Sequence, residues 1–153
     1  MSYSEEEIQG IIERSCAELK ETQPLLFDEA SDINERTISS ELAGIIRQYV
    51  KDLHVNCEYN RMTDENGTQI PKRIGLDPSH SKSSRVYPDI IIHRQEDGEH
   101  NLLIVEVKMS WKNDKKEHDF EKLNRYVQEL RYQYGLYLEL GKEGISKMKW
   151  FKN

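Results

Sequence analysis

The sequence has no long apolar segment. Of its 153 residues, 36% are hydrophobic and 33% are charged, and no apolar run approaches the roughly 20 residues that a membrane-spanning helix needs. Residues 1–7 also lack the basic and apolar regions of a signal peptide. We therefore expect a polar, soluble protein of single-domain size that makes no membrane contact.

Cysteine is nearly absent. The two cysteines, Cys16 and Cys57, fit neither the paired spacing of a zinc site nor a disulfide framework. Cys16 falls on the apolar stripe of an expected helix and Cys57 lies in an expected strand, so both are predicted to be small buried hydrophobic residues. This cysteine usage favours a reducing, cytoplasmic location.

Positive charge is scarce in the first part of the chain. The net charge is −6. Residues 1–60 contain 5 Lys and Arg against 13 Asp and Glu, whereas residues 61–153 contain 17 against 15. The overall acidity argues against a general nucleic-acid binder, but the mildly basic second part is compatible with a polyanionic substrate.

Capping signals and apolar periodicity predict two N-terminal helices. Ser4 and Glu7 form a capping box at the start of the first, which should span residues 4–20. Asn34 is the expected N-cap of the second, which should span residues 34–53.

The rest of the chain has the pattern of strands and one further helix. A short strand is predicted over 54–61, and residues 62–85 show no periodicity, which in a compact domain is typical of a functional or mobile loop. A helix is predicted over 114–134, ended by Gly135. Two closing strands should follow, at 136–140 and 145–151.

Two apolar runs in the middle of the chain, 86–93 and 101–108, flank the dipeptide Asp97-Gly98. This dipeptide favours a two-residue type I′ turn, because both central residues need positive φ. With that turn, partner residues have numbers that total 195, so Asp89 faces Glu106. Opposed Cβ atoms lie about 4.5–5.5 Å apart, and like charges so placed destabilise a sheet. The pair therefore predicts a cation between the two carboxylates.

Lys108 should join this pair. Side chains alternate along a strand, so Glu106 and Lys108 share the face that carries Asp89. Two carboxylates beside an ammonium suit a hard divalent cation, Mg²⁺ or Mn²⁺. The lysine would then orient the attacking water and offset charge on phosphorus. The alternative is a structural ion network, because buried charges must be paired.

The run Pro88-Asp89, sixteen residues and then Glu106-Val107-Lys108 resembles the signature of the PD-(D/E)XK nuclease superfamily. The predicted order of elements from residue 34 is similar to the α-β-β-β-α-β core of that superfamily. The resemblance covers roughly residues 34–140. It implies an α/β restriction-endonuclease-like fold with a central mixed sheet flanked by helices. Residues 1–33 would be an N-terminal helical extension and residues 141–153 part of a C-terminal hairpin, all in one domain, 1–153.

The resemblance also implies an activity, Mg²⁺- or Mn²⁺-dependent hydrolysis of phosphodiester bonds, with DNA as the expected substrate. Asp89 and Glu106 would hold the metal, the carbonyl of Val107 would be a further ligand, and Lys108 would position the water. Superfamily members often carry an acidic residue on the first core helix, and Glu35 is the matching residue here. The alternative for Glu35 is that it only stabilises the positive end of the helix dipole.

Other charged residues have two interpretations each. Glu58 could approach the metal, or pair with Arg61 or Arg36. Basic residues of the 62–85 segment and of the long helix could contact a nucleic-acid backbone, although a solvated face is the default for the helix: Lys72, Arg73, Lys82, Arg85, Lys115, Lys116 and Lys122.

No element that could read bases, and no separate recognition domain, is visible in the sequence. This favours a weakly specific or structure-guided nuclease, a homodimer, or a subunit that borrows its targeting from a partner. The main alternative function is a catalytically inactive nuclease-like module for nucleic-acid or protein interaction.

Overall fold

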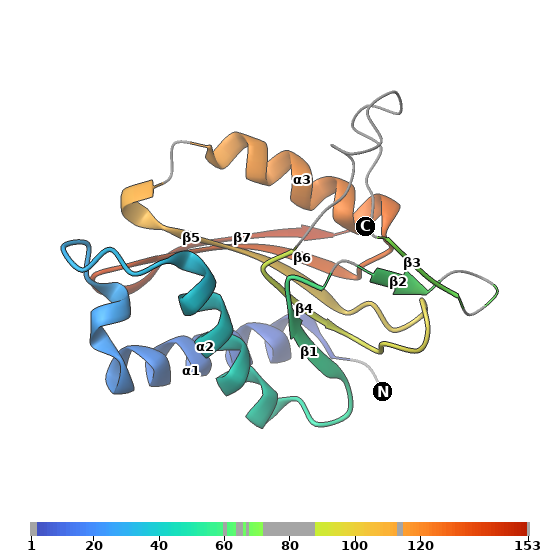
Figure 1. Cartoon of the computed structure of the whole chain (residues 1–153), viewed down its shortest axis with the longest axis horizontal. Coiled ribbons are helices and arrows are strands. Elements are labelled where there is room, and N and C mark those ends of the chain that lie inside the picture. The colour runs from blue at the N-terminus through green and yellow to red at the C-terminus, as the bar shows by residue number, and fades with distance from the viewer. Residues whose placement is uncertain are drawn as a thin grey trace.

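The computed structural model describes residues 3–59, 61–63, 66, 68–71, 88–112 and 115–152 of the chain. They form an α/β structure in which a five-stranded mixed sheet lies between helices (Figure 1). Helices α1 (Glu5–Thr22) and α2 (Glu35–Tyr49) cover one face, and α3 (Lys116–Glu129) covers the other. The prediction of a mixed sheet flanked by helices is confirmed. Among the described residues, no helix has the length and apolar character needed to cross a membrane.

The strands of the main sheet lie in the order β1-β4-β5-β6-β7. Their bounds are β1 His54–Cys57, β4 Ile90–His93, β5 Leu103–Met109, β6 Tyr134–Gly141 and β7 Gly144–Lys152. Strands β5 and β6 are parallel and joined through α3, whereas every other neighbouring pair is antiparallel. Strand β5 lies in the middle of the sheet, as its apolar character on both faces predicts.

Local signals place both N-terminal helices correctly. Ser4 and Glu7 form the predicted capping box of α1, and the Asn34 side chain accepts hydrogen bonds from the first backbone N–H groups of α2. Helix α2 ends at Tyr49, earlier than predicted, because Val50 leaves the helix in an extended conformation and packs into the core. A 3₁₀ helix, η1 (Pro24–Phe27), connects α1 towards α2.

The register of β4 against β5 is the predicted one. Ile90 faces Val105, Ile91 faces Ile104, and Ile92 faces Leu103. Next to the connection the register shifts by one residue, because the N–H of Leu102 donates to the carbonyl of Ile92. This shift is a β-bulge, which bends the strand without changing the pairing further along it.

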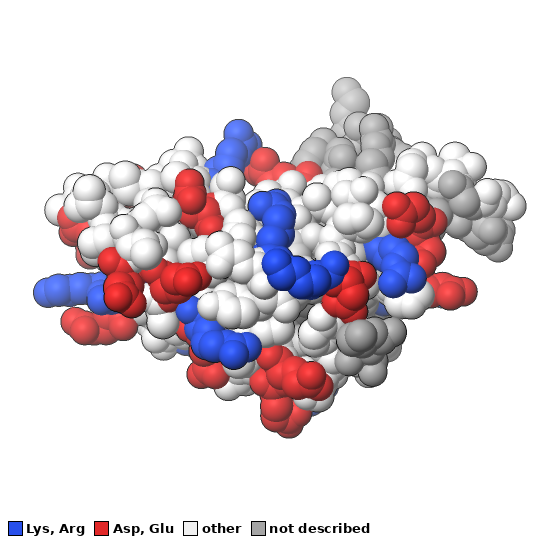
Figure 2. Space-filling view, turned by 90° about the horizontal axis from the view of Figure 1, so that it is seen from below, with Lys and Arg blue, Asp and Glu red and all other residues white. Residues whose placement is uncertain are grey.

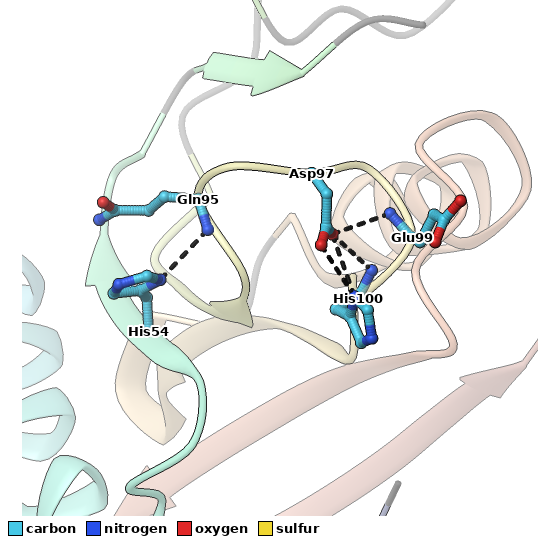
Figure 3. A network of polar contacts seen from close by, with 5 residues as sticks. All are labelled: His54, Gln95, Asp97, Glu99 and His100. Atoms are coloured by element: carbon cyan, nitrogen blue, oxygen red, sulfur yellow. Dashed lines mark hydrogen bonds and ion pairs between the residues drawn. The ribbon is translucent and has the colours of Figure 1, made fainter. Parts of the chain in front are cut away.

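The predicted type I′ turn is wrong. The N–H of Arg94 donates to the carbonyl of His100, and Asp97 does not adopt the positive φ that such a turn needs. Instead, the Asp97 carboxylate accepts hydrogen bonds from the N–H groups of Glu99 and His100, and the N–H of Gln95 donates to the ring of His54 on β1 (Figure 3). A side chain therefore organises a longer loop in place of a tight turn.

The predicted end of the third helix is also wrong. Helix α3 stops at Glu129, and Arg131 adopts a left-handed φ of 60°. Gly135 belongs to β6, where a Cβ atom would lie 3.1 Å from Cγ1 of Val127. Glycine is needed there for close packing of α3 on the sheet, not as a helix stop. Parallel pairing of β6 with β5 begins at Tyr134, so this residue belongs to a strand and not to the predicted end of the helix.

The segment between β1 and β4 differs from the prediction where it is described. Strand β1 ends at Cys57, and Glu58 has a φ of 50°. A separate two-stranded sheet follows, formed by β2 (Arg61–Thr63) and β3 (Gln69–Pro71). The predicted continuous strand to Arg61 and the fully irregular segment over 62–85 are corrected accordingly.

Two apolar clusters, one on each face, fix which way the β5 side chains point. Leu103, Val105 and Val107 pack with α1 and α2. Ile104, together with Ile91 of β4 and Tyr137 of β6, packs with α3. Because side chains alternate, Glu106 and Lys108 share the α3 face with Ile104.

Candidate functional site

Two carboxylates accept hydrogen bonds from the part of β5 that extends beyond its pairing with β4. The last paired residues are Ile90 and Val105. Beyond them, the N–H of Val107 donates to Oδ2 of Asp89 at 2.8 Å. The N–H of Met109 donates to Oε2 of Glu35 at 3.0 Å. The side chains of Asp89, which directly precedes β4, and of Glu35, the first residue of α2, thus bond the part of β5 that lies beyond its pairing with β4.

The carbonyl of Val107 points to this same edge. Within a strand, the N–H and C=O of one residue lie on the same side. The N–H of Val107 is engaged by Asp89. Its carbonyl therefore lies on the same edge of β5 as the Asp89 carboxylate.

Asp89 and Glu106 are brought together. Glu106 is only 6% exposed, whereas Asp89 keeps partial access to solvent as a residue. Burial of its carboxylate, then the charge of Glu106, raise the pKa of Asp89 well above its ordinary value, although the bond from Val107 opposes the rise. The Glu106 carboxyl lies within interaction distance of the Asp89 carboxyl. Two carboxylates so close repel each other, and a proton or a cation relieves that repulsion.

Helix α3 supplies the groups that surround Glu106. The hydroxyl of Tyr126 donates to Oε1 of Glu106 at 3.1 Å. The ammonium of Lys122 lies 3.5 Å from the same oxygen. Burial, then the charge of Glu106 and the bond to it, raise the pKa of Tyr126, so its hydroxyl stays a donor. Lys122 is directed inward, which differs from the solvent-facing position that its helical spacing suggested.

Lys108 is held by a residue that the sequence did not assign to the site. Its Nζ lies 3.1 Å from Oδ2 of Asp119 on α3, and Asp119 is buried. Burial alone would lower the pKa of Lys108, but the hydrogen bond and charge of Asp119 outweigh it and raise the pKa. Lys108 therefore remains a protonated ammonium, directed by Asp119 instead of lying free beside Asp89.

The cluster keeps an excess of negative charge. It contains the four carboxylates of Glu35, Asp89, Glu106 and Asp119, against the two ammonium groups of Lys108 and Lys122. In the part of the chain that the structure describes, no three His, Cys, Asp or Glu side chains converge closely enough to hold a metal by themselves. The site thus offers a carboxylate pair and a backbone carbonyl, and a divalent ion would complete its shell with water or substrate oxygen.

Where the structure describes the other predicted residues, their side chains are not part of this cluster, although the N–H of Glu58 donates to the backbone carbonyls of Pro88 and Asp89. The Glu58 side chain is paired with Arg36, with Nε 3.3 Å from Oε2, which is one of the two pairings considered for it. Lys115 is exposed and Lys116 is half-buried at the start of α3. Four predicted backbone contacts lie outside the described residues: Lys72, Arg73, Lys82 and Arg85.

Two residues of the cluster, Asp119 and Tyr126, were not assigned to it from the sequence, although a signal was present. The buried positions of α3 are 119, 123, 126 and 127, which recur at helical spacing. Polar residues on an apolar stripe indicate a buried polar contact. Glu139, also buried, accepts a hydrogen bond from the hydroxyl of Tyr137 at 2.8 Å.

Comparison of the chain with models of known families, with curated proteins and with solved structures gives no match.

Proposed function

We propose that this protein is a Mg²⁺- or Mn²⁺-dependent nuclease of the PD-(D/E)XK type, with a restriction-endonuclease-like core, that hydrolyses phosphodiester bonds in DNA. The order α2-β1-β4-β5-α3-β6 supports this fold assignment. The observation that carries the proposal is the contact of Asp89 with Glu106, two carboxylates in one buried spot with the Val107 carbonyl on the same edge. Such a pair is stabilised by a hard cation.

The chain's own residues have separate tasks in this mechanism. Asp89, Glu106 and the Val107 carbonyl would hold the metal, which supplies Lewis-acid activation of water and of the phosphate when bound. Lys108, kept protonated by Asp119, stabilises negative charge that develops on the phosphoryl oxygens. Glu35 holds the end of β5 in place and adds negative potential at the metal edge.

The surface charge favours approach of the substrate from the α3 side. Seen from the side of α1 and α2, acidic and basic side chains are interspersed, and no continuous basic area covers this face (Figure 2). The net negative charge of the chain arises in residues 1–60, where acidic residues outnumber basic ones, and this part contains α1, α2 and β1. A polyanion is therefore expected to contact the sheet edge and α3.

One observation favours an inactive nuclease-like module instead. Lys122 and Lys108 already form ion pairs with Glu106 and Asp119, which is how a purely structural network satisfies buried charges. In that case the carboxylate pair would remain protonated and bind no metal. The two functions differ in one property, a metal-dependent gain in stability.

The test measures thermal unfolding and plasmid nicking together. Wild-type protein should unfold at a higher temperature when Mg²⁺ or Mn²⁺ is added, because a ligand of the folded state raises stability. Asp89→Ala should abolish that shift. Nicking with Mn²⁺ should be lost in Lys108→Ala but kept in Glu121→Gln, which removes a carboxylate from an exposed ion pair on α3. Cleavage that persists unchanged in Lys108→Ala, or the absence of any metal shift, would contradict the proposal.

A further inference from the structure

A pair of lysines lies on the α3 face of the edge strand β7. Lys147 and Lys149 are both exposed. Their ammonium groups lie 5.4 Å and 4.4 Å from the ring centroid of Phe120 on α3. Lys149 also lies 5.6 Å from the ring of Phe151. One aromatic ring thus holds two cations close together.

Neither lysine forms an ion pair with a carboxylate of the described residues. The neighbouring Lys152 behaves differently, since its Nζ lies 2.6 Å from Oε1 of Glu5. The side chain of Lys152 points to the α1 face, because residues alternate along β7. Cation–π contacts stabilise an ammonium but leave its remaining N–H groups available to an external anion. The two lysines are therefore preorganised for an anionic ligand.

The sheet register relates these lysines to the candidate catalytic cluster. Lys149 faces Tyr137 of β6, and Tyr137 faces Glu106 of β5. In the next row, Lys147 faces Glu139, and Glu139 faces Lys108. Neighbouring strands lie about 4.8 Å apart, so the β7 row is roughly 10 Å from the β5 row across the sheet.

Two adjacent residues of α3 contact the carboxylate cluster and the lysine pair, respectively. Asp119 contacts Lys108, whereas Phe120 contacts Lys147, Lys149 and Phe151. A chain of phosphates that crosses the first turns of α3 would reach the carboxylate cluster on one side and the two lysines on the other. The exposed Lys115 lies at the start of the same helix.

We propose that Lys147 and Lys149, held by Phe120 and Phe151, form a subsite for the phosphodiester backbone of the nucleic acid whose cleavage is proposed above. The inference rests on that proposed function for its ligand class. The subsite binds backbone and not bases, because ammonium groups contact phosphates without reading sequence. It explains how a chain with a net charge of −6 can bind a polyanion through a local surface.

Binding is measured by fluorescence anisotropy with a labelled 20-nucleotide single-stranded DNA and its duplex, in EDTA so that no cleavage occurs. Each phosphate contact to a single strand contributes about 0.7 to the slope of log K against log salt concentration. Lys149→Gln should lower the slope by about 0.7 and weaken binding roughly fivefold at ~0.1 M salt. Lys147→Gln with Lys149→Gln should lower the slope by about 1.4.

Lys152→Gln is the matched control, since it removes one positive charge from the same strand but from the opposite face. It should leave the slope unchanged. The replacement of both Lys147 and Lys149 by Arg keeps the charges and should preserve binding, which separates charge from folding. Equal slope changes in Lys149→Gln and Lys152→Gln would overturn the inference, as would competition by poly-glutamate as strong as that by unlabelled DNA.

The outcome also separates this inference from the nuclease proposal. Metal-dependent cleavage by the wild-type protein, together with DNA binding that is unchanged when Lys147 and Lys149 are replaced, would reject the subsite alone. Lysine-dependent binding without cleavage by the wild-type protein would reject the nuclease and keep the subsite. A wild-type protein that binds neither DNA form rejects the subsite, whatever the metal does.

Discussion

The surroundings of Asp89 disfavour the charged form of its carboxyl group. It accepts only one backbone hydrogen bond from β5, and it shares its position with Glu106. Burial and that neighbour raise its pKa above the ordinary value of 3.8. A carboxylic acid in this state stabilises the protein while it is protonated, so its contribution is complete near its ordinary pKa and is lost as the pH rises through the raised pKa.

Asp89→Asn should therefore stabilise the metal-free protein at pH 8. The amide keeps an oxygen for the N–H of Val107 but carries no charge, so we expect a gain on the order of 1 kcal/mol. Urea unfolding in EDTA between pH 5 and pH 9 measures it, and the difference from wild type should grow with pH. Saturating Mg²⁺ should reverse the order of the two proteins.

Asp97 provides the contrasting control for this pH dependence. Hydrogen bonds from the ring and N–H of His100 outweigh burial and lower the pKa of Asp97. Its contribution is therefore present above its ordinary pKa and lost as the pH falls. Asp97→Asn should destabilise the protein at pH 8, with a difference that shrinks in acid. The same sign for both variants would contradict the assignment of Asp89.

Asp119 determines where the Lys108 ammonium lies. If the proposed nuclease function is right, Asp119→Asn should lower turnover at least tenfold, because Lys108 would no longer be directed to the phosphate, and the rise in melting temperature with Mg²⁺ should be retained. Asp119→Glu should recover part of the turnover. Plasmid nicking combined with thermal shifts measures both properties. Loss of the metal shift in Asp119→Asn would mean that Asp119 acts on the metal or on folding instead.

At the scale of elements, Glu35 joins the start of α2 to the end of β5. Its carboxylate accepts a hydrogen bond of 3.0 Å from the N–H of Met109, which lies beyond the pairing of β5 with β4. Glu35→Ala should destabilise the protein by about 1–2 kcal/mol, because it leaves this N–H without its partner. Glu35→Gln keeps an acceptor and should cost less than half of that. Denaturant unfolding gives both values, and equal losses would show that charge and not the acceptor matters.

The packing of α3 on β6 depends on a glycine. A Cβ atom at position 135 would lie 3.1 Å from Cγ1 of Val127 and 3.4 Å from the carbonyl of Leu123. Gly135→Ala should therefore destabilise the protein by about 1–3 kcal/mol through overpacking. Gly10→Ala is the matched control, since nothing lies within 4 Å of its Cβ position in α1. It should stabilise by about 0.5–1 kcal/mol. Thermal unfolding of both variants tests the contrast.

At the scale of the whole molecule, net charge and local charge have different consequences. Glu13 and Glu21 are exposed on α1, on the face opposite α3. Reversal of both to lysine changes the net charge by +4, yet the Debye length is only about 8 Å at 0.15 M salt. We expect DNA affinity to change less than about threefold under these conditions, and more at 0.01 M. A large gain at 0.15 M would show that overall charge, not a local surface, governs binding.

Local chemistry made part of the structure predictable. The capping residues Ser4 and Asn34 determine where α1 and α2 begin through hydrogen bonds to their own helices. The register that opposes Asp89 and Glu106 was predicted from a type I′ turn at Asp97-Gly98, and the pairs from Ile90–Val105 to Ile92–Leu103 keep that register although the turn is wrong. A one-residue slip would have moved every buried side chain to the wrong face, so the pattern constrains register more strongly than turn type does.

The sequence by itself determined where α1 and α2 begin, the two central strands and the meeting of two carboxylates, because capping and strand pairing act within one element or between two neighbouring strands. The tertiary structure decided which lysine forms an ion pair with which carboxylate. Lys108 turns to Asp119 and Lys122 to Glu106 only because α3 packs across β5 with that side inward. Glu35 meets Met109 only because α2 begins at the unpaired end of β5. Such contacts join residues distant in the chain, and their geometry depends on helix rotation and packing, which no local pattern encodes.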